Sequence, residues 1–454
     1  MSGRALPGIA ARIRLPELDR AAQRIMLGAA SRIRAGRLTV VLPDGSTRAF
    51  GDPSAAMKAE IRIHDARATL RMFLGGDTGA GEAYMDGSWS SPDLPALLRL
   101  ASLNREALGL SSGWWRLPLR LQKTLAHRAR RNTVGGSRRN IAAHYDLGND
   151  LFAAMLDERM LYSAAKFATP ETSLEDAQLA KLDAICRKLE LRPDDHLLEI
   201  GTGWGGLAIH AAGHYGCRVT TTTISREQHA LATERVRAAG LQDRVTVLLR
   251  DYRELDDSYD KLVAVEMIEA VGWRNFDRFF ARVSDLLEPD GLALLQAILI
   301  DDRAYDVEKA GRSFITTFIF PGGALPSMEV MARCVRRRTD LQWLGVEDLT
   351  HDYVLTLRHW RDRFLAAAPA LQPAGYDRRF QRLWELYLRY CEAGFMERRI
   401  TDVQALLAKP GYRPRPAQPR GARVNMRRLT ESSRNAGPRE ASLARARRPP
   451  GPTT

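Results

Sequence analysis

Four residues in the stretch HLLEIGTGWGG (196–206) have the types and spacing of a ligand-binding turn. Glu199 is followed by Gly201, Gly203 and Gly205, directly after an apolar run. Glycine adopts the positive φ angles of a tight turn and lets a ligand approach the backbone. Strands that turn into helices at such glycines bind nucleotide cofactors at the carboxyl edge of a parallel sheet. The spacing therefore predicts a strand, a turn that binds an adenine-containing cofactor, and a helix; a tight turn without a ligand is the alternative.

The glycine pattern of this turn is compatible with two kinds of cofactor, a nicotinamide dinucleotide and S-adenosylmethionine. Gly201, Gly203 and Gly206 also satisfy the dinucleotide pattern G-x-G-x-x-G, which expects a carboxylate about 20 residues further on to hold a ribose. The second strand ends in TTTTIS, without an acidic residue. Glu199 resembles instead the acidic residue in the first motif of S-adenosylmethionine-dependent methyltransferases. A carboxylate near the turn suits a sulfonium cation better than a pyrophosphate, so we expect S-adenosylmethionine.

Strands and helices are predicted to alternate after residue 196. Strand-like runs cover 196–200, 217–224, 244–249, 261–267 and 292–300, with amphipathic segments at 226–240 and 275–291. This alternation implies βαβ units and a mainly parallel sheet covered on both faces. An apolar insert follows at 314–331, then helices from about residues 352 and 376 and the run 402–407. The pattern predicts a Rossmann-like α/β fold.

The 454 residues divide into three parts. A hairpin pattern at 37–50, a strand pattern at 61–66 and helical spacing at 93–104 predict a small N-terminal α+β domain, followed by a charged linker at 125–140. After residue 410, eleven arginines stand against two glutamates in a Pro- and Gly-rich segment, which predicts a disordered basic tail. The predicted boundaries are 1–137 (lipid or dimer contacts), 138–410 (methyltransferase) and 411–454 (tail).

Charge and cysteine usage narrow the class of protein. Much of the net charge of +14 lies in the tail, so it gives little support for a nucleic-acid enzyme. A basic tail suits any polyanion, an anionic membrane surface as well as RNA, and a solvated tail without a function is the alternative. The four cysteines form no CxxC pair, and His210 and His214 have no acidic residue between them, so we expect no metal site. Without a long apolar run or a signal-peptide pattern, we expect a cytoplasmic protein.

Further segments closely resemble the cyclopropane-fatty-acyl-phospholipid synthase family, which includes the mycolic acid cyclopropane synthases. In chain order they are AHYDLGNDLF (143–152), LDERMLYS (156–163), EIGTGWGGLA (199–208), TTISREQ (222–228), DYREL (251–255), VEMIEAVG (265–272), FIFPGGALPS (318–327), HDYVLTLRHW (351–360) and YLRYCEAGF (387–395). The stretch 75–89 resembles the N-terminal domain of the full-length enzymes. The resemblance implies a seven-stranded methyltransferase sheet and a homodimer.

The resemblance also implies the reaction and its residues. The family transfers a methyl or methylene group from S-adenosylmethionine to the double bond of an unsaturated phospholipid acyl chain, at the inner face of the cell membrane. The positions that match cofactor contacts are Tyr162, Glu199, Gly201, Gly203, Gly205, Ser225, Gln228 and Tyr252. The positions that match catalytic residues are Glu269, Tyr353, Gln296 and Cys391, of which Glu269 and Tyr353 hold a bicarbonate ion that acts as the base. Tyr252 and Cys391 could equally be packing residues, and the insert 314–328 is assigned to the acyl-chain pocket.

The chain departs from the family pattern around the bicarbonate. Ala164 replaces a cysteine, Ala270 replaces a histidine, and Gln296, which replaces a second histidine, cannot take up a proton at neutral pH. Methyl transfer is expected to be intact, whereas the deprotonation that closes a ring is in doubt. The product is then a cyclopropane or a methyl- or methylene-branched acyl chain. The alternatives are a methyltransferase for a small non-lipid acceptor and a non-catalytic lipid-binding protein.

Overall fold

The computed structural model describes residues 16–108, 148–309, 311 and 313–414. It separates two units, Met1–Arg413 and Pro414–Thr454. The predicted tail lies, except for its first four residues, outside the described residues, as does the predicted linker at 125–140. No helix among the described residues is long and apolar enough to cross a membrane.

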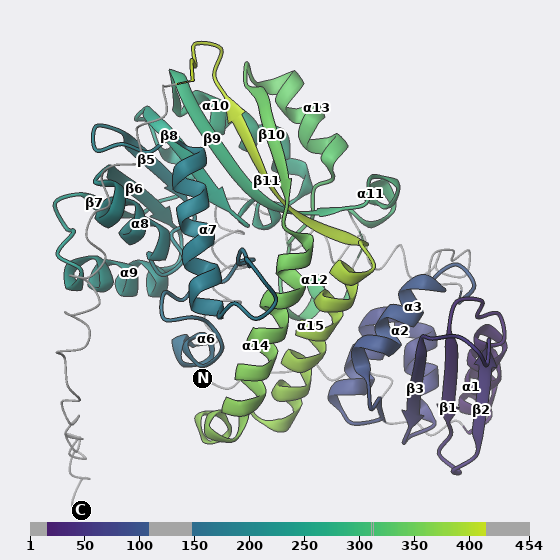
Figure 1. The fold of residues 1–454 in the computed structure, drawn as a ribbon. Helices are drawn as coiled ribbons and strands as arrows, with labels where there is room; N and C mark the ends of the chain where they lie inside the picture. Colours follow the sequence, from purple (N-terminus) through teal and green to yellow (C-terminus); the bar gives the residue numbers. More distant parts are fainter. Residues whose placement is uncertain (1–15, 109–147, 310, 312, 415–454) are drawn as a thin grey trace, which may run out of the picture. The chain divides into compact units, whose positions relative to one another are not determined.

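The N-terminal part is a small α+β arrangement (Figure 1, purple). Its sheet has the order β2-β1-β3-β4, and three helices accompany it: α1 (Pro16–Ala30), β1 (Arg37–Val41), β2 (Thr47–Gly51), β3 (Lys58–Ile63), α2 (Arg67–Met85), β4 (Trp89–Ser90) and α3 (Leu94–Leu103). The predicted hairpin is confirmed, since β1 and β2 pair antiparallel with Val41 opposite Thr47. The carboxylate of Asp93 accepts the backbone N–H of Ala96 (2.9 Å) and caps α3, the helix that the spacing at 93–104 predicts.

The second sheet has seven strands in the order β10-β11-β9-β8-β5-β6-β7. They are β5 (His196–Ile200), β6 (Arg218–Thr223), β7 (Val245–Leu249), β8 (Tyr259–Val265), β9 (Leu287–Ile300), β10 (Gln342–Asp348) and β11 (Ile400–Ala408). The five strands from β9 to β7 are parallel, whereas β11 runs antiparallel to β9 and β10 antiparallel to β11. The predicted seven-stranded α/β sheet is therefore confirmed.

Alternate side chains of the central strands enter two hydrophobic cores. Leu197 on β5 packs in the core that includes Leu182 of α7 (Leu174–Lys188), whereas Leu198 packs in the core that includes Phe279 of α10 (Phe276–Asp285). Successive side chains of a strand point to opposite faces, so both faces of the sheet are covered.

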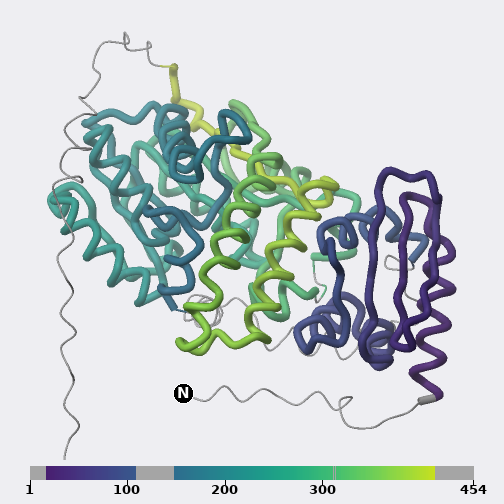
Figure 2. The backbone as a smooth tube through the Cα atoms, turned by 60° about the horizontal axis from the view of Figure 1, so that its bottom comes forward, coloured from purple at the N-terminus to yellow at the C-terminus, as the bar shows by residue number. Residues whose placement is uncertain are grey.

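The remaining helices complete the second part. They are α6 (Asn149–Met155), α8 (Gly206–His210), η3 (Ala211–Tyr215), α9 (Arg226–Ala238), η4 (Tyr252–Glu254), η5 (Ile268–Ala270), η6 (Trp273–Asn275), α11 (Asp302–Glu308), α12 (Phe314–Phe318), α13 (Met328–Arg338), α14 (Thr350–Leu371), η7 (Gln372–Ala374) and α15 (Arg378–Met396). The long helices α14 and α15 pack side by side, as Figure 2 shows in green and yellow-green. They are the two predicted C-terminal helices.

Candidate active site

The predicted cofactor turn joins β5 to α8. Gly201, Gly203 and Gly205 have φ angles of 103°, 51° and 84°, which side chains rarely adopt. A Cβ atom added at Gly203 would meet no atom within 4 Å, whereas one at Gly206 would lie 2.9 Å from the carbonyl oxygen of Arg159. The turn therefore has the predicted backbone shape, with open space at Gly203 and a tightly packed helix start.

Glu199, the carboxylate before the turn, is 5% exposed. Its Oε2 atom has no hydrogen-bond partner among the described residues, and burial raises its pKa to about 8. A nearby positive charge stabilises such a buried carboxylate, whereas a negative charge destabilises it further. Glu199 and the open turn therefore fit S-adenosylmethionine, which carries a sulfonium and an amino group, better than they fit a pyrophosphate.

Ser225 and Gln228 lie beside the turn, at the carboxyl end of β6. The Ser225 hydroxyl accepts the backbone N–H of Gln228 (3.2 Å) and caps α9, and the Gln228 side-chain oxygen accepts the Thr223 hydroxyl (2.7 Å). Both side chains have a structural role at the edge where a cofactor would lie, and their contact with it stays a prediction.

Tyr252 packs in the hydrophobic core. It is 8% exposed, and its ring contacts Phe279 edge to face with 5.6 Å between the centroids. This packing favours the alternative that Tyr252 is a strand-end core residue, and its contact with the cofactor stays a prediction.

Tyr162 belongs to an aromatic cluster. Its hydroxyl lies 2.7 Å from the Tyr387 hydroxyl of α15, and its ring centroid lies 5.0 Å from that of Trp360 on α14 and 5.3 Å from that of Phe152. Phe320, which comes from the apolar insert, has its centroid 6.5 Å from Tyr162. Aromatic faces attract cations by about 0.5 to 2 kcal/mol. The cluster is suited to an apolar ligand with cationic character.

Glu266, which the sequence analysis did not select, lies at the centre of the polar site. One carboxylate oxygen accepts the backbone N–H of Ala164 (2.7 Å) and the side-chain amide of Gln296 (2.9 Å), and the other accepts the Tyr353 hydroxyl (2.6 Å). Its φ of 48° is unusual for a residue with a side chain and costs on the order of 1 to 3 kcal/mol. Burial raises its pKa, while these donors and Lys181 lower it. The surrounding protein therefore holds a carboxylate of elevated basicity at one fixed position.

Glu269 lies one turn further along, in η5. One carboxylate oxygen accepts the backbone N–H of Ile298 (2.5 Å), and Oε2 has no partner among the described residues. Burial and the charge of Glu266 raise its pKa to about 8. Tyr353, which the resemblance pairs with Glu269 around a bicarbonate, donates its hydroxyl to Glu266 instead.

A third carboxylate and one ammonium group complete the polar site. Asp402 of β11 is fully buried and accepts the Gln296 amide (2.9 Å), and burial together with Glu266 and Glu269 raises its pKa well above the usual value. Lys181 is 1% exposed and donates to the Ser163 hydroxyl (2.6 Å); burial lowers its pKa to about 8. Asp402 and Lys181 are buried from solvent, whereas Glu266 and Glu269 keep some exposed surface and can contact a substrate.

The other predicted residues have clear positions. Cys391 lies on α15 among hydrophobic residues, and burial raises its pKa to about 12, so its thiol is protonated at neutral pH. This favours the packing interpretation. Ala164 contributes only its backbone N–H to the site, and Ala270 lies beside Glu269 in η5.

The structure brings together Glu269, Tyr353 and Gln296, and adds Glu266. The signal for Glu266 was present in the sequence: an acidic residue stands near the end of the strand-like run 261–267, in VEM, while three side chains expected around an anion are replaced. The place of Glu266 in the site becomes visible only in the structure, where its carboxylate contacts Ala164 and Gln296.

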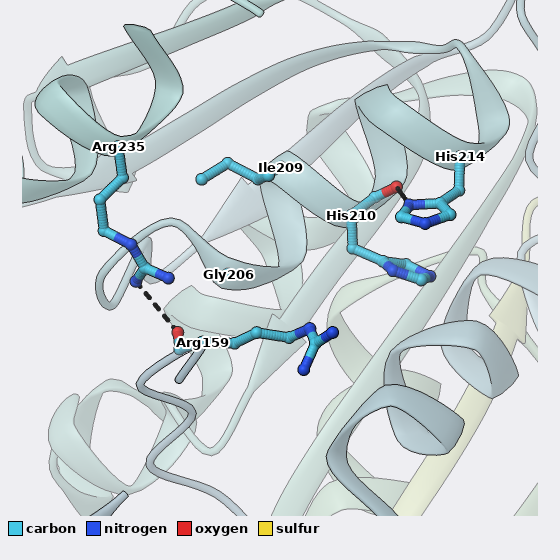
Figure 3. A pocket seen from close by; sticks show the side chains of 6 residues that line it. All are labelled: Arg159, Gly206, Ile209, His210, His214 and Arg235. Carbon is cyan, nitrogen blue, oxygen red and sulfur yellow. Dashed lines mark hydrogen bonds between the residues drawn. The ribbon is translucent and has the colours of Figure 1, made fainter. Parts of the chain in front are cut away.

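A separate cavity of about 70 Å³ lies beside the first turn of α8 (Figure 3). Its lining residues are Arg159, Gly206, Ile209, His210, His214 and Arg235. The Arg235 guanidinium donates to the carbonyl oxygens of Arg159 (3.0 Å) and Trp204 (2.8 Å). None of the predicted site residues lines this cavity, and Arg235 supports the glycine turn through Trp204.

Comparison with known proteins agrees with this fold. The family model described as mycolic acid cyclopropane synthetase matches residues 134–405. The chain is 39% identical over 382 residues to tuberculostearic acid methyltransferase UfaA1 of Mycobacterium tuberculosis, which covers 82% of this chain and 88% of that protein. It is 38% identical over 356 residues to cyclopropane-fatty-acyl-phospholipid synthase of Escherichia coli, covering 77% and 88%. The structure of mycolic acid cyclopropane synthase CmaA1 with S-adenosylhomocysteine and CTAB is similar with a TM-score of 0.56 at 29% identity, over 60% of this chain and 98% of that one.

The fold and the glycine turn define an S-adenosylmethionine-dependent methyltransferase. The chain belongs to the mycolic acid cyclopropane synthetase family. Its relatives form cyclopropane or methyl-branched fatty acids. The chain therefore modifies lipids with S-adenosylmethionine as cofactor.

Proposed function

We propose that the chain transfers a methyl group to the double bond of an unsaturated phospholipid acyl chain and that the side chain of Glu266 removes the proton afterwards. When bound, S-adenosylmethionine supplies an electrophilic methyl group. Glu199 and the turn from Gly201 to Gly205 would hold this cofactor. The observation that carries the proposal is the Glu266 carboxylate, which accepts hydrogen bonds from Ala164, Gln296 and Tyr353.

These three donors support a base that belongs to the chain. The resemblance assigns the surroundings of Ala164, Gln296 and Tyr353 to a bicarbonate ion, and here each of the three residues binds the carboxylate of Glu266. A second anion at the same donors would lie against Glu266, and like charges at that distance repel strongly. We therefore propose that bicarbonate is not used.

In the proposed reaction, the double bond of the acyl chain would form a C–C bond to the methyl group that the bound cofactor supplies. The methyl–sulfur bond would break with its electron pair staying on sulfur, and the neighbouring carbon of the chain would become a cation. Tyr162 and Phe320, which keep some exposed surface, are suited to stabilise that charge with their ring faces. Glu266 takes one proton, and the electron pair of the broken C–H bond neutralises the cation. The net change in the lipid is the addition of CH₂.

We propose that the product is methylene-branched, after a hydride shift moves the cation to the carbon that carries the new methyl group. The similarity to a tuberculostearic acid methyltransferase over 82% of the chain supports a branched product, and the replacement of the ring-site histidine by Gln296 agrees with it. Direct loss of the proton without the shift would give a cyclopropane. A saturated methyl branch would need a separate reductant.

The aromatic cluster is the reason to prefer an acyl chain to a small polar acceptor. Phe320 comes from the apolar insert and lies against both Tyr162 and Tyr387, whose centroid is 6.0 Å away. We propose that the insert binds the acyl chain. We also propose that the protein is a homodimer at the cytoplasmic face of the membrane, with residues 1–137 making lipid or dimer contacts and 411–454 attracted to anionic lipids.

Mass spectrometry of phospholipids from cells that express the chain, fed methionine with a deuterated methyl group, tests the proposal. We expect acyl chains that are heavier by one labelled methylene group and retain two of the three deuterium atoms. Catalytic hydrogenation under mild conditions distinguishes a methylene group, which is reduced, from a cyclopropane. Absence of label in all acyl chains, together with label in a small metabolite, would contradict the lipid assignment.

A further inference from the structure

A line of hydrogen bonds leads from Glu266 through two side-chain amides to a lysine. The Gln296 amide nitrogen donates to Glu266 (2.9 Å), the Gln404 amide nitrogen donates to the Gln296 oxygen (3.0 Å), and the Lys188 ammonium donates to the Gln404 oxygen (2.5 Å). We call Gln296, Gln404 and Lys188 the amide relay. Lys188 also binds the carboxylate of Glu347.

Sheet register and helix length build the relay. Gln296 of β9 and Gln404 of β11 are directly opposite each other in the antiparallel pair, so their side chains lie on the same face. They are 0% and 2% exposed. Lys188 is the last residue of α7, and its side chain is 27% exposed. The relay therefore connects the buried carboxylate with the protein surface.

Lys188, at the surface end of the relay, determines which way the side-chain amides of Gln404 and Gln296 are turned. A side-chain amide can turn over and exchange its oxygen with its NH₂ group, but an ammonium group only donates. Facing Lys188, Gln404 must present its oxygen, and its NH₂ group then points to the oxygen of Gln296. Gln296 in turn presents its NH₂ group to Glu266 and to Asp402 (2.9 Å).

This direction matters most when a carboxylate gains a proton. Ionised Glu266 and Asp402 only accept, so they orient Gln296 by themselves; a protonated carboxyl group also donates and would tolerate the reversed amide. Burial raises the pKa of both carboxyl groups, so each takes up a proton at a higher pH than an ordinary carboxyl group does. Lys188 removes the ambiguity, because the reversed relay would point an NH₂ group at an ammonium group.

We propose that Lys188 and Gln404 are positioning residues that keep the Gln296 amide donating to Glu266 throughout the proposed catalytic cycle. This inference rests on the proposed role of Glu266. A permanently aligned donor favours the ionised carboxylate and holds it in one place. The other charged or titratable groups around Glu266 among the described residues are Tyr353 of α14, Lys181 of α7, Glu269 of η5, Tyr387 of α15 and Asp402 of β11.

Infrared titration of the protonated carboxyl group tests the relay on the full chain without any lipid. The band that disappears in Glu266→Gln is assigned to Glu266, and its midpoint is then followed in Lys188→Met and Gln404→Leu. We expect both variants to raise the midpoint by about one pH unit or more, because protonated Glu266 can then donate to a reversed Gln296 amide and is stabilised relative to the ionised carboxylate. Gln404→Leu leaves the charge of Lys188 in place and so separates alignment from simple charge removal.

Two further variants serve as controls for Lys188→Met. Lys188→Arg keeps a side chain that only donates, and we expect it to restore the wild-type midpoint. Lys166→Met removes the lysine that binds the other oxygen of Glu347, while leaving Gln404 untouched; we expect little change. Melting temperatures show whether each variant is folded, and Lys188 and Lys166 are both partly exposed.

Three results would overturn the inference: equal shifts in Lys188→Met and Lys166→Met, equal shifts in Lys188→Met and Lys188→Arg, or no shift in a folded Gln404→Leu.

The acid limb of the kcat profile should move with the infrared midpoint. If the midpoints behave as expected but no acyl chain is methylated, the relay stands and the proposed function fails. If acyl chains are methylated and the midpoints do not move, the proposed function stands and the relay is wrong.

Discussion

Replacing Glu266 by glutamine isolates the charge of this carboxylate. The amide oxygen can accept the N–H of Ala164 and the NH₂ of Gln296, while the amide nitrogen donates to the Tyr353 oxygen, which can turn its own proton away. All three contacts are therefore kept in the variant. Only the negative charge and the ability to take up a proton are lost.

We expect turnover to fall by about 10² to 10⁴, the usual contribution of a positioned general base. This corresponds to about 3 to 5.5 kcal/mol in the activation free energy. The free energy of unfolding should stay the same or increase, because removing a partly buried charge whose hydrogen bonds are retained relieves a desolvation cost. Loss of activity with retained stability would identify Glu266 as a functional residue.

The assay follows transfer of labelled methyl groups into phospholipid acyl chains, with the melting temperature and S-adenosylmethionine affinity measured on the same samples. Glu266→Asp is the companion variant: it keeps the charge but shortens the side chain by one methylene group, so it should lose part of the activity. Should Glu266→Gln retain more than about a tenth of wild-type turnover, Glu266 is not the base and the reasoning from its three donors is refuted.

Four further outcomes are expected. Glu266→Gln should lower the pKa of the Glu269 carboxyl group, because the charge of Glu266 together with burial raises that pKa to about 8; an unchanged infrared midpoint for Glu269 would argue against coupling. In the cofactor-free protein, the raised pKa of Glu199 means that its stabilising contribution is complete below pH 4.5 and is lost as the pH rises to about 8. Urea unfolding should show this as a slope of up to about 1.4 kcal/mol per pH unit, absent in Glu199→Gln. S-adenosylmethionine, but not NAD, should raise the melting temperature; calorimetry with the opposite result would remove the cofactor assignment. Deleting 411–454 should leave cofactor affinity unchanged and weaken binding to anionic vesicles by up to about 1 kcal/mol per arginine near the surface, less in salt; equal vesicle binding would exclude the tail from membrane attachment.

Most of the fold could be predicted because its signals are local. The alternation of apolar runs with amphipathic segments predicts the sheet, and the patterns at 37–50 and 93–104 predict the hairpin and the helix near the N-terminus. The glycine turn could be predicted because positive φ angles leave a direct mark on the sequence.

The polar site could be predicted only in part, because it depends on contacts between distant segments. Glu269, Tyr353 and Gln296 were found by resemblance, but the partner of Tyr353 was not, since Glu266 and Tyr353 are 87 residues apart. The positive φ of Glu266 and the register that sets Gln296 opposite Gln404 have no local pattern. Asp402 and Lys181 are missed for the same reason: each looks like an ordinary charged residue until the fold buries it.

The hydrogen bonds around Glu266 also have a physiological consequence. A dissolved anion must be captured anew by each enzyme molecule, and its occupancy follows the supply of carbon dioxide in the cell. A tethered carboxylate has an effective concentration far above that of any dissolved ion, on the order of 10⁵ M or more in well-oriented cases. With Glu266 as the proposed base, lipid modification by this chain should proceed at the same rate in carbonate-poor and carbonate-rich surroundings.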